Sequence, residues 1–249
     1  MYRKKILVAI PVFNETNVSN IVRGVKNFSL DVLVIDDGST YSLREELLNV
    51  ENVHMLVHPR NLGYGKTIID AYRYAIKKRY DYLLTIDGDG QHEPEEIPLF
   101  LNSIPFYDYD ILSGSRFLFP FKPGEDVPED RYRINRKITR IVNQITGFGL
   151  TDSFCGFKMY KVEQLKLLRL TEYGYGMPLQ VWMQAWRMGL RVREIPVKLI
   201  YKNLAKHFEG ALEDPDTRLR YYKSIIRKEL GDAEHSNITL CRTNKTLKY

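Results

Sequence analysis

The sequence has little cysteine and no long apolar run. Only two of its 249 residues are cysteines, Cys155 and Cys241, which excludes a disulfide scaffold and a cysteine-rich zinc domain. No segment approaches the roughly 20 apolar residues that a membrane-spanning helix needs. Residues 1–5 end in three basic side chains and precede a short apolar run that Pro11 interrupts. Because no cleavage-like site follows, we expect no export signal. The expected compartment is the reducing cytoplasm.

Charge is unevenly distributed along the chain. Residues 1–115 contain 12 Lys and Arg against 16 Asp and Glu, a net charge of −4, whereas residues 116–249 carry a net charge of +10. An acidic first half suggests metal or sugar chemistry, and a basic second half suggests an anionic partner. Charge alone does not distinguish a nucleic acid, a membrane surface and a phosphorylated substrate as that partner.

The first half alternates between short apolar runs and segments with helical spacing. Apolar runs predict buried strands, and the spacing between them predicts helices of 9 to 15 residues. This alternation indicates an α/β fold with an open, mostly parallel sheet, in which ligands bind at the carboxyl ends of the strands. The expected strands are 6–10, 32–35, 53–57, 82–86 and 110–114, and the expected helices are 14–28, 41–49, 65–78 and 94–102.

The second half is less regular. Residues 118–130 are rich in Pro, Gly and acidic residues and predict a loop. Further helices are expected at 131–147, around 163–169, at 177–188 and from 214 to about 230, with strands at 157–160 and 191–201. We expect one catalytic domain over residues 1–230, with halves meeting near 115, and a polar tail over 231–249.

The expected helix at 131–147 is basic and amphipathic. Within that range it has no acidic residue, and its apolar residues fall on one face. Such a helix suits the surface of an anionic membrane. The same pattern also fits a helix whose apolar face packs on the sheet and whose basic face is exposed to solvent, so both interpretations stay open.

Asp87-Gly-Asp89 is the strongest chemical motif. Two carboxylates one residue apart at a strand end can reach one divalent cation, and Gln91 can add an amide ligand. Asp and Gly also form turns for purely structural reasons, so the motif alone leaves both readings open. His92 is isolated and is interpreted as polar packing more readily than as a ligand.

Two further polar turns follow predicted strands. Asp36-Asp37-Gly38-Ser39 offers adjacent carboxylates to a nucleobase or ribose, and Pro11-Val-Phe-Asn14-Glu15 ends the first strand at the same edge. Each is equally typical of a strand-to-helix turn. Familiar alternatives fail, because a P-loop ending at Gly65-Lys66 would need glycine where Arg60 stands.

Taken together, these motifs resemble the inverting glycosyltransferases of family 2, which have the GT-A nucleotide-sugar-binding fold. The second half resembles dolichol-phosphate mannose synthases within that family. The resemblance covers residues 5–202. The matching segments are Pro11-x-x-Asn14-Glu15, Val34-Ile-Asp36-Asp37-Gly-Ser, Asn61-Leu-Gly-Tyr-Gly65, Asp87-Gly-Asp89-Gly-Gln91-His-Glu-Pro, Gly114-Ser-Arg116, Asp152-Ser-Phe-Cys-Gly-Phe-Lys158 and Glu194-Ile-Pro-Val197.

The resemblance implies roles for particular residues. Asp87, Asp89 and Gln91 correspond to a group that binds Mg²⁺ or Mn²⁺ against the donor diphosphate. Arg116 corresponds to an arginine near the transferred sugar and the acceptor phosphate. Further residues correspond to the nucleoside pocket, namely Pro11, Asn14, Glu15, Asp36 and Asp37, and to the acceptor-phosphate site, namely Arg131, Asn135 and Lys202.

The expected function is metal-dependent, inverting transfer of a hexose, mannose from GDP-mannose, to a polyprenyl (dolichyl-type) phosphate. Such an enzyme is expected to contact a membrane peripherally, on its cytoplasmic face. The alternative is transfer to a saccharide or another soluble acceptor, with a UDP-sugar as a candidate donor. A hydroxyl acceptor needs a base, for which Asp152 is the candidate. Nucleic-acid binding is not expected, because no RNP-type or zinc-finger pattern is present.

Overall fold

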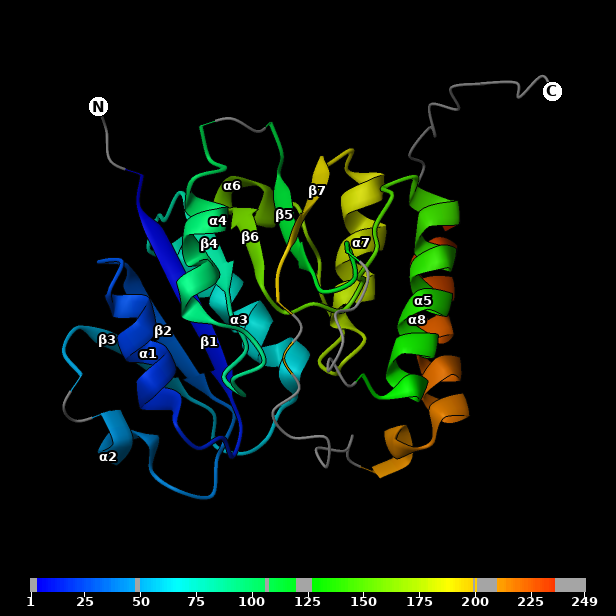
Figure 1. Cartoon of the computed structure of the whole chain (residues 1–249). Helices are drawn as coiled ribbons and strands as arrows, with labels where there is room; N and C mark the ends of the chain where they lie inside the picture. The colour runs from blue at the N-terminus through cyan, green and yellow to red at the C-terminus, as the bar shows by residue number, and fades with distance from the viewer. Residues whose placement is uncertain are drawn as a thin grey trace.

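The computed structural model describes residues 4–47, 50–105, 108–119, 127–198, 200 and 210–235. Its centre is a seven-stranded sheet in the order β3-β2-β1-β4-β6-β5-β7. In Figure 1, β1 starts near the N-terminus at the top and runs downward. The strands are β1 Ile6–Val12, β2 Asp31–Asp36, β3 Val53–Val57, β4 Tyr82–Thr85, β5 Ile111–Ser115, β6 Lys158–Lys161 and β7 Val192–Pro196.

All strand pairs are parallel except those of β6. This strand lies between β4 and β5 and is antiparallel to both. Its first residue, Lys158, pairs in register with Thr85 of β4 and with Ser113 of β5. Because β6 runs the opposite way, its beginning lies at the edge where its two neighbours end, which brings a buried lysine to that edge.

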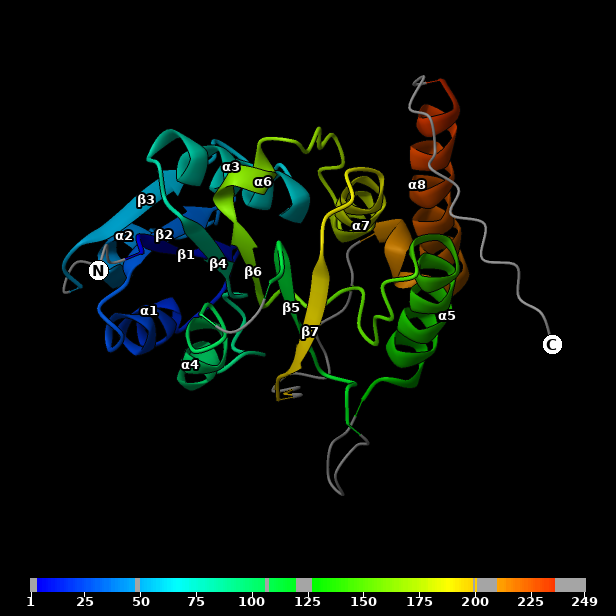
Figure 2. The ribbon, with the colours of Figure 1, turned by 90° about the horizontal axis from the view of Figure 1, so that it is seen from above.

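Helices cover both faces of the sheet. Figure 2 shows α1 and α4 on one face and α3, α6 and α7 on the other, with α5 and α8 side by side beyond β7. The helices are α1 Val18–Lys26, α2 Leu43–Leu47, α3 Tyr64–Lys77, α4 Ile97–Leu101, α5 Glu129–Thr146, α6 Val162–Leu165, α7 Met177–Arg187 and α8 Pro215–His235, with short 3₁₀ helices at Pro94–Glu96 and Gly210–Glu213.

The apolar runs form strands because both of their faces are buried. In β1, Leu7 and Ala9 belong to the core under α3 and α7, and Val8 and Ile10 belong to the core under α1 and α4. Alternate side chains of a strand point to opposite faces, so a continuous apolar run suits a strand covered on both sides. Burial therefore fixes the register that places the polar turns at the carboxyl edge.

The predicted α/β fold with its mostly parallel sheet is confirmed, and several predicted boundaries are wrong. Helix α5 begins at Glu129, so its first turn contains Glu129 and Asp130, where carboxylates complement the helix dipole. The expected 163–169 helix ends at Leu165, β7 ends at Pro196, and α8 continues to His235. None of the helices in the described part of the chain has the length and apolar character that a membrane crossing needs.

Candidate active site

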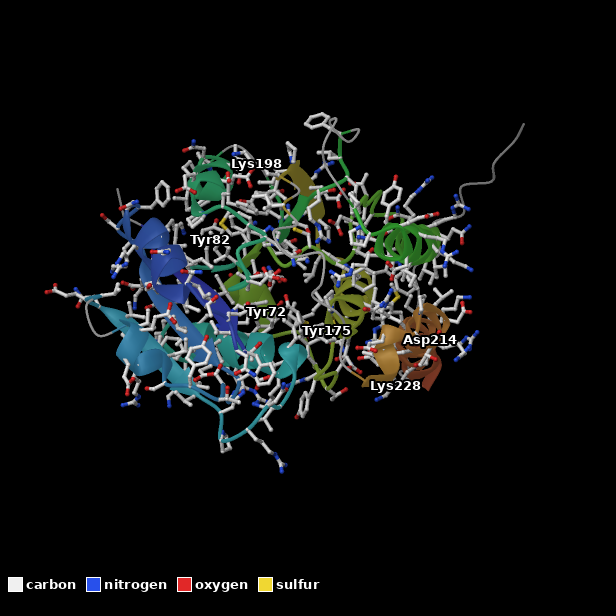
Figure 3. The ribbon with its side chains drawn as sticks, turned by 60° about the horizontal axis from the view of Figure 1, so that its bottom comes forward. Tyr72, Tyr82, Tyr175, Lys198, Asp214 and Lys228 are labelled. Carbon is white, nitrogen blue, oxygen red and sulfur yellow. The ribbon has the colours of Figure 1, made fainter. Side chains whose placement is uncertain are left out.

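A cavity of about 660 Å³ opens at the carboxyl edge of the sheet. Figure 3 looks toward this edge and shows Tyr175 between α3 and α7. Its lining comes from the segments after β1, β2, β3, β4 and β5 and from α3, α5, α7 and α8. Among the predicted site residues, those that line it are Pro11, Asn14, Glu15, Asp37, Asp87, Asp89, Gln91, Arg116, Arg131 and Asn135.

Three predicted site residues are not part of this lining. Asp36 is buried, and its Oδ1 accepts the backbone N–H of Ser39 at 2.8 Å. Asp152 lies behind the wall, fully buried. Lys202 lies outside the described residues. Asp36 shapes the turn that carries Asp37, and its assignment to the nucleoside pocket stays a prediction.

The turn after β4 brings both carboxylates of the acidic motif to the cavity. Gly88 allows the turn to lie against β1, because a Cβ there would stand 2.7 Å from the carbonyl oxygen of Pro11. The Asp89 carboxylate accepts the backbone N–H of Gln91 at 3.0 Å and its side-chain amide at 2.7 Å. Asp89 and Gln91 thus present oxygens from one short segment.

Asp87 has a more enclosed setting than Asp89. Tyr64 donates its hydroxyl to Oδ1 at 3.3 Å, and His92 Nε2 lies 3.3 Å from Oδ2. Burial acts to raise the pKa of Asp87, but the hydrogen bond and charge of His92, with Lys158 and Arg116, lower it overall. Asp87 is therefore ionised at neutral pH, and the buried His92 supports it from behind, as polar packing.

The acidic motif could hold a divalent ion only if a bound diphosphate and water supply the remaining oxygen ligands. Within the described ranges, no group of three or more His, Cys, Asp and Glu side chains could hold a metal ion. Two carboxylates and one amide nevertheless match Mg²⁺, which typically takes one or two carboxylates and fills its remaining positions with water and substrate phosphates. The donor set fits a metal shared with a diphosphate.

Arg116 supplies a positive charge that acts on Asp87 of the acidic motif. Its Nε donates to Asp152 Oδ2 at 2.7 Å and its Nη2 to Oδ1 at 3.1 Å, a bidentate pair. Burial acts to raise the pKa of Asp152, but Arg116 and a hydrogen bond from Asn135 hold it well below its ordinary range. A buried carboxylate of such low basicity is poorly suited to be a general base and well suited to orient Arg116.

Glu194 supports this pair from β7. Its carboxylate accepts the backbone N–H of Thr151 at 2.7 Å, the Thr151 hydroxyl at 2.8 Å and the backbone N–H of Asp152 at 3.0 Å. The late Glu-Ile-Pro strand therefore fixes the segment that carries Asp152.

Helix α5 contributes Arg131 and Asn135, four residues apart on the face that meets the cavity. Asn135 donates from Nδ2 to Asp152 Oδ1 at 2.7 Å, and its Oδ1 accepts the Thr139 hydroxyl at 2.9 Å. Asn135 is thus part of the network that fixes Asp152, and Arg131 brings a second guanidinium to the same wall.

Other cavity residues were not predicted from the sequence. Among them are the aromatic residues Tyr64, Phe154, Tyr175 and Tyr222, together with Arg218. Arg218 is buried, donates to the carbonyl oxygen of Leu212 at 3.0 Å and pairs with Asp130. The spacing of four between Arg218 and Tyr222 indicates one helix face, but it does not reveal which surface that face meets.

The described fold, with its mostly parallel sheet and carboxyl-edge cavity, is of the GT-A class. The chain belongs to glycosyl transferase family 2, whose model matches residues 7–168. The family assignment confirms that the protein is a glycosyltransferase and confirms the resemblance drawn from its motifs.

Similar proteins of known name cover most of the chain. An undecaprenyl-phosphate mannosyltransferase of Micrococcus luteus is 26% identical over 81% of this chain and 86% of its own length. A UDP-N-acetylglucosamine–dolichyl-phosphate N-acetylglucosaminyltransferase of Methanococcus voltae is 28% identical over 81% and 88%. The glucosyl-3-phosphoglycerate synthase of Mycobacterium tuberculosis, solved with Mn²⁺, UDP and phosphoglyceric acid, shares the fold with a TM-score of 0.66 at 16% identity, over 92% of this chain and 79% of that one.

Proposed function

We propose that this glycosyltransferase moves a hexose from a nucleotide sugar to a polyprenyl phosphate with inversion of configuration. The observation that carries the proposal is one cavity that is lined both by the carboxylates of the acidic motif and by the guanidinium groups of Arg116 and Arg131. The relatives from Micrococcus luteus and Methanococcus voltae are both named for transfer to a polyprenyl-type phosphate, which supports the same acceptor class here.

The acidic side is proposed to bind the donor. Asp89, Asp87 and Gln91 would hold Mg²⁺ or Mn²⁺ together with the diphosphate, and Pro11, Glu15 and Asp37 would form the wall beside the nucleoside. A bound cation supplies positive charge against the charge that develops on the diphosphate leaving group. Mn²⁺ or Mg²⁺ in complexes of a protein with the same fold supports this cofactor choice.

The basic side is proposed to bind the acceptor phosphate. Arg116 and Arg131 would position a phosphate oxygen in line with the sugar carbon, since guanidinium groups bind phosphate through paired N–H donors. The phosphate oxygen is already anionic, so its attack needs no general base. Asp152 is proposed to keep Arg116 in place, with Asn135 completing the network.

The donor is proposed to be GDP-mannose. The resemblance to dolichol-phosphate mannose synthases and the mannosyltransferase from Micrococcus luteus favour it. The relative from Methanococcus voltae is named for a UDP-sugar, so UDP-N-acetylglucosamine is the competitor to include in any assay. Transfer to a saccharide hydroxyl is disfavoured, because Asp152 is buried against Arg116.

Contact with a membrane surface is proposed to occur beside the acceptor side. Arg133, Arg136, Lys137 and Arg140 are exposed on α5, and Phe119 is 67% exposed nearby in the chain. Basic residues with an apolar side chain suit an anionic lipid surface. Co-sedimentation with phosphatidylglycerol vesicles should fall when Arg136, Lys137 and Arg140 become glutamine. Equal sedimentation of the two proteins would contradict the contact.

The proposed reaction can be tested by partitioning of a labelled product. The enzyme would be incubated with Mg²⁺, undecaprenyl or dolichyl phosphate, and either labelled GDP-mannose or labelled UDP-N-acetylglucosamine. We expect label to enter the organic phase only with the lipid phosphate, and to do so from GDP-mannose. If label stays in the aqueous phase with both donors, the proposal of a polyprenyl-phosphate acceptor is wrong. If label is transferred from UDP-N-acetylglucosamine alone, the proposal of GDP-mannose as the donor is wrong.

A further inference from the structure

His58 lies behind the donor wall, between two carboxylates. It follows β3 directly, is 5% exposed, and its backbone N–H donates to the carbonyl oxygen of Asp36 at 2.8 Å. Its ring Nδ1 is 2.6 Å from Asp37 Oδ1, and its Nε2 is 3.0 Å from Asp70 Oδ2. Both ring nitrogens therefore face carboxylate oxygens in a buried site.

Both carboxylates act as acceptors in this site. Asp37 accepts the backbone N–H groups of Leu62 and Gly63, at 2.9 and 2.8 Å, one on each oxygen. Asp70 pairs with Lys66 through Oδ2 and accepts Arg73 Nη1 at 3.1 Å through Oδ1. Burial acts to raise the pKa of Asp70, but hydrogen bonds from Lys66 and His58 lower it overall.

A neutral imidazole has one N–H and one lone pair, so it can donate to only one of the two carboxylates. The other contact would then set a lone pair against a carboxylate at 2.6 or 3.0 Å. A doubly protonated ring satisfies both contacts, and charge-assisted hydrogen bonds of this kind are the strong ones. The positive charges that share the site are those of Lys66 and Arg73, both on Asp70.

We propose that His58 is held as an imidazolium ion and is a positioning residue for the donor wall. It ties Asp37, and through Asp37 the backbone of Leu62 and Gly63, to Asp70 on α3. The segment held in this way includes Gly63 and Tyr64, which line the cavity, and Tyr64 donates to Asp87. Loss of the second proton would set a lone pair against one carboxylate and loosen the donor side.

The protonation state can be read directly by ¹⁵N nuclear magnetic resonance of the unsubstituted protein. Because both ring nitrogens face carboxylate oxygens, we expect both nitrogens of His58 to carry protons at neutral pH, and the exposed His54 on β3 serves as a reference signal. A spectrum in which His58 has one protonated and one bare nitrogen at pH 7 would overturn the proposal. This measurement needs no variant and no ligand.

The positioning role is tested with His58→Gln, and His54→Gln is the matched control on β3. Because the role in donor binding depends on the proposed function, GDP and UDP would each be titrated with Mn²⁺ alongside the kinetic assay. We expect the donor KM to rise about tenfold in His58→Gln, as expected for a lost charge-assisted bond. The acceptor KM and kcat should stay close to those of the unsubstituted enzyme.

The pH profile separates positioning from a merely structural role. In the unsubstituted enzyme the donor KM should rise with increasing pH as His58 loses its second proton, whereas in His58→Gln it should be high and lack that rise. Equal donor KM values, or the same rise in both enzymes, would overturn the role. If neither nucleotide binds the unsubstituted protein, the proposed donor class fails, and the ¹⁵N spectrum still decides the state of His58.

Discussion

The two carboxylates of the acidic motif have different neighbours. Asp87 contacts Tyr64 and His92, whereas Asp89 accepts both N–H donors of Gln91. Gly156 lies so close to Asp87 that a Cβ there would stand 2.1 Å from Oδ2. The position of both carboxylates at the carboxyl edge was predictable from the sequence, because a buried strand directly precedes them. It could not predict the close approach of Gly156, which depends on how β6 enters the sheet.

Asp89→Asn should abolish most metal-dependent transfer. The amide keeps the size of the side chain but removes the charge, so we expect kcat/KM to fall about 100-fold or more, the loss of several kcal/mol of charge stabilisation. Steady-state assays with Mg²⁺ measure this fall in kcat/KM. Glu95→Gln, on an exposed side chain in the same segment, is the control and should retain activity. Full activity of Asp89→Asn would contradict a metal role.

Asp152→Asn should destabilise the fold by about 3 kcal/mol at pH 7, since it leaves Arg116 without its buried partner. The pKa of Asp152 is lower in the folded than in the unfolded chain. Its ionisation therefore stabilises the fold above about pH 4, and this contribution is lost as the pH falls below that value. Urea unfolding of both proteins should show a difference that shrinks toward pH 3.

The exposed Asp216→Asn is the control for that experiment and should change stability by no more than about 0.5 kcal/mol. Equal stability of Asp152→Asn and the unsubstituted protein at pH 7 would show that the pair with Arg116 is not needed for folding. The partners of Asp152 were not predictable from the sequence, because Arg116 and Asn135 reach it only through packing of α5 against the sheet.

At the scale of elements, α3 and the segment before α7 meet at Gly65. A Cβ at Gly65 would stand 2.4 Å from the carbonyl oxygen of Glu172 and 2.8 Å from Met177 Cβ. This contact explains why the start of α3 carries glycine next to the cavity residue Tyr64. It also joins the donor half of the chain to the segment that carries Tyr175.

Gly65→Ala should therefore cost about 1–3 kcal/mol of stability, the usual penalty for overpacking. Differential scanning calorimetry would show a lower Tm. Gly231→Ala in α8 is the matched control, since no atom of the described residues lies within 4 Å of its added Cβ and alanine favours a helix by about 0.5–1 kcal/mol. An equal gain in Tm for both variants would contradict the close approach seen at Gly65.

Some elements were predictable and others were not. Strands β1, β2 and β4 follow from apolar runs that are buried on both faces, and β3 follows from a shorter run at the edge of the sheet. The direction of β6 was not predicted, because the four residues Lys-Met-Tyr-Lys carry no signal that distinguishes a parallel from an antiparallel neighbour. The acids that start α5 were assigned to the preceding loop, because the expected helix was begun at Arg131.

At the scale of the whole molecule, the acidic first half and the basic second half of the chain line one cavity together. Its lining includes carboxylates from the turn after β4 and guanidinium groups from the residue after β5, from α5 and from α8. The opposing charges and the carboxyl-edge location were predictable from the sequence. The contribution of α8 was not predictable, because the spacing of Arg218 and Tyr222 indicates one helix face but not the surface that this face meets.

The central claim is that Asp89 and the diphosphate of a nucleotide share a cation in this cavity. Calorimetric titration of GDP into the enzyme, with and without Mn²⁺, tests it most directly. The account predicts binding that weakens about 100-fold or more when Mn²⁺ is withheld or when Asp89→Asn is used, because the diphosphate then meets uncompensated carboxylates. Affinity that is the same in all three titrations would contradict it.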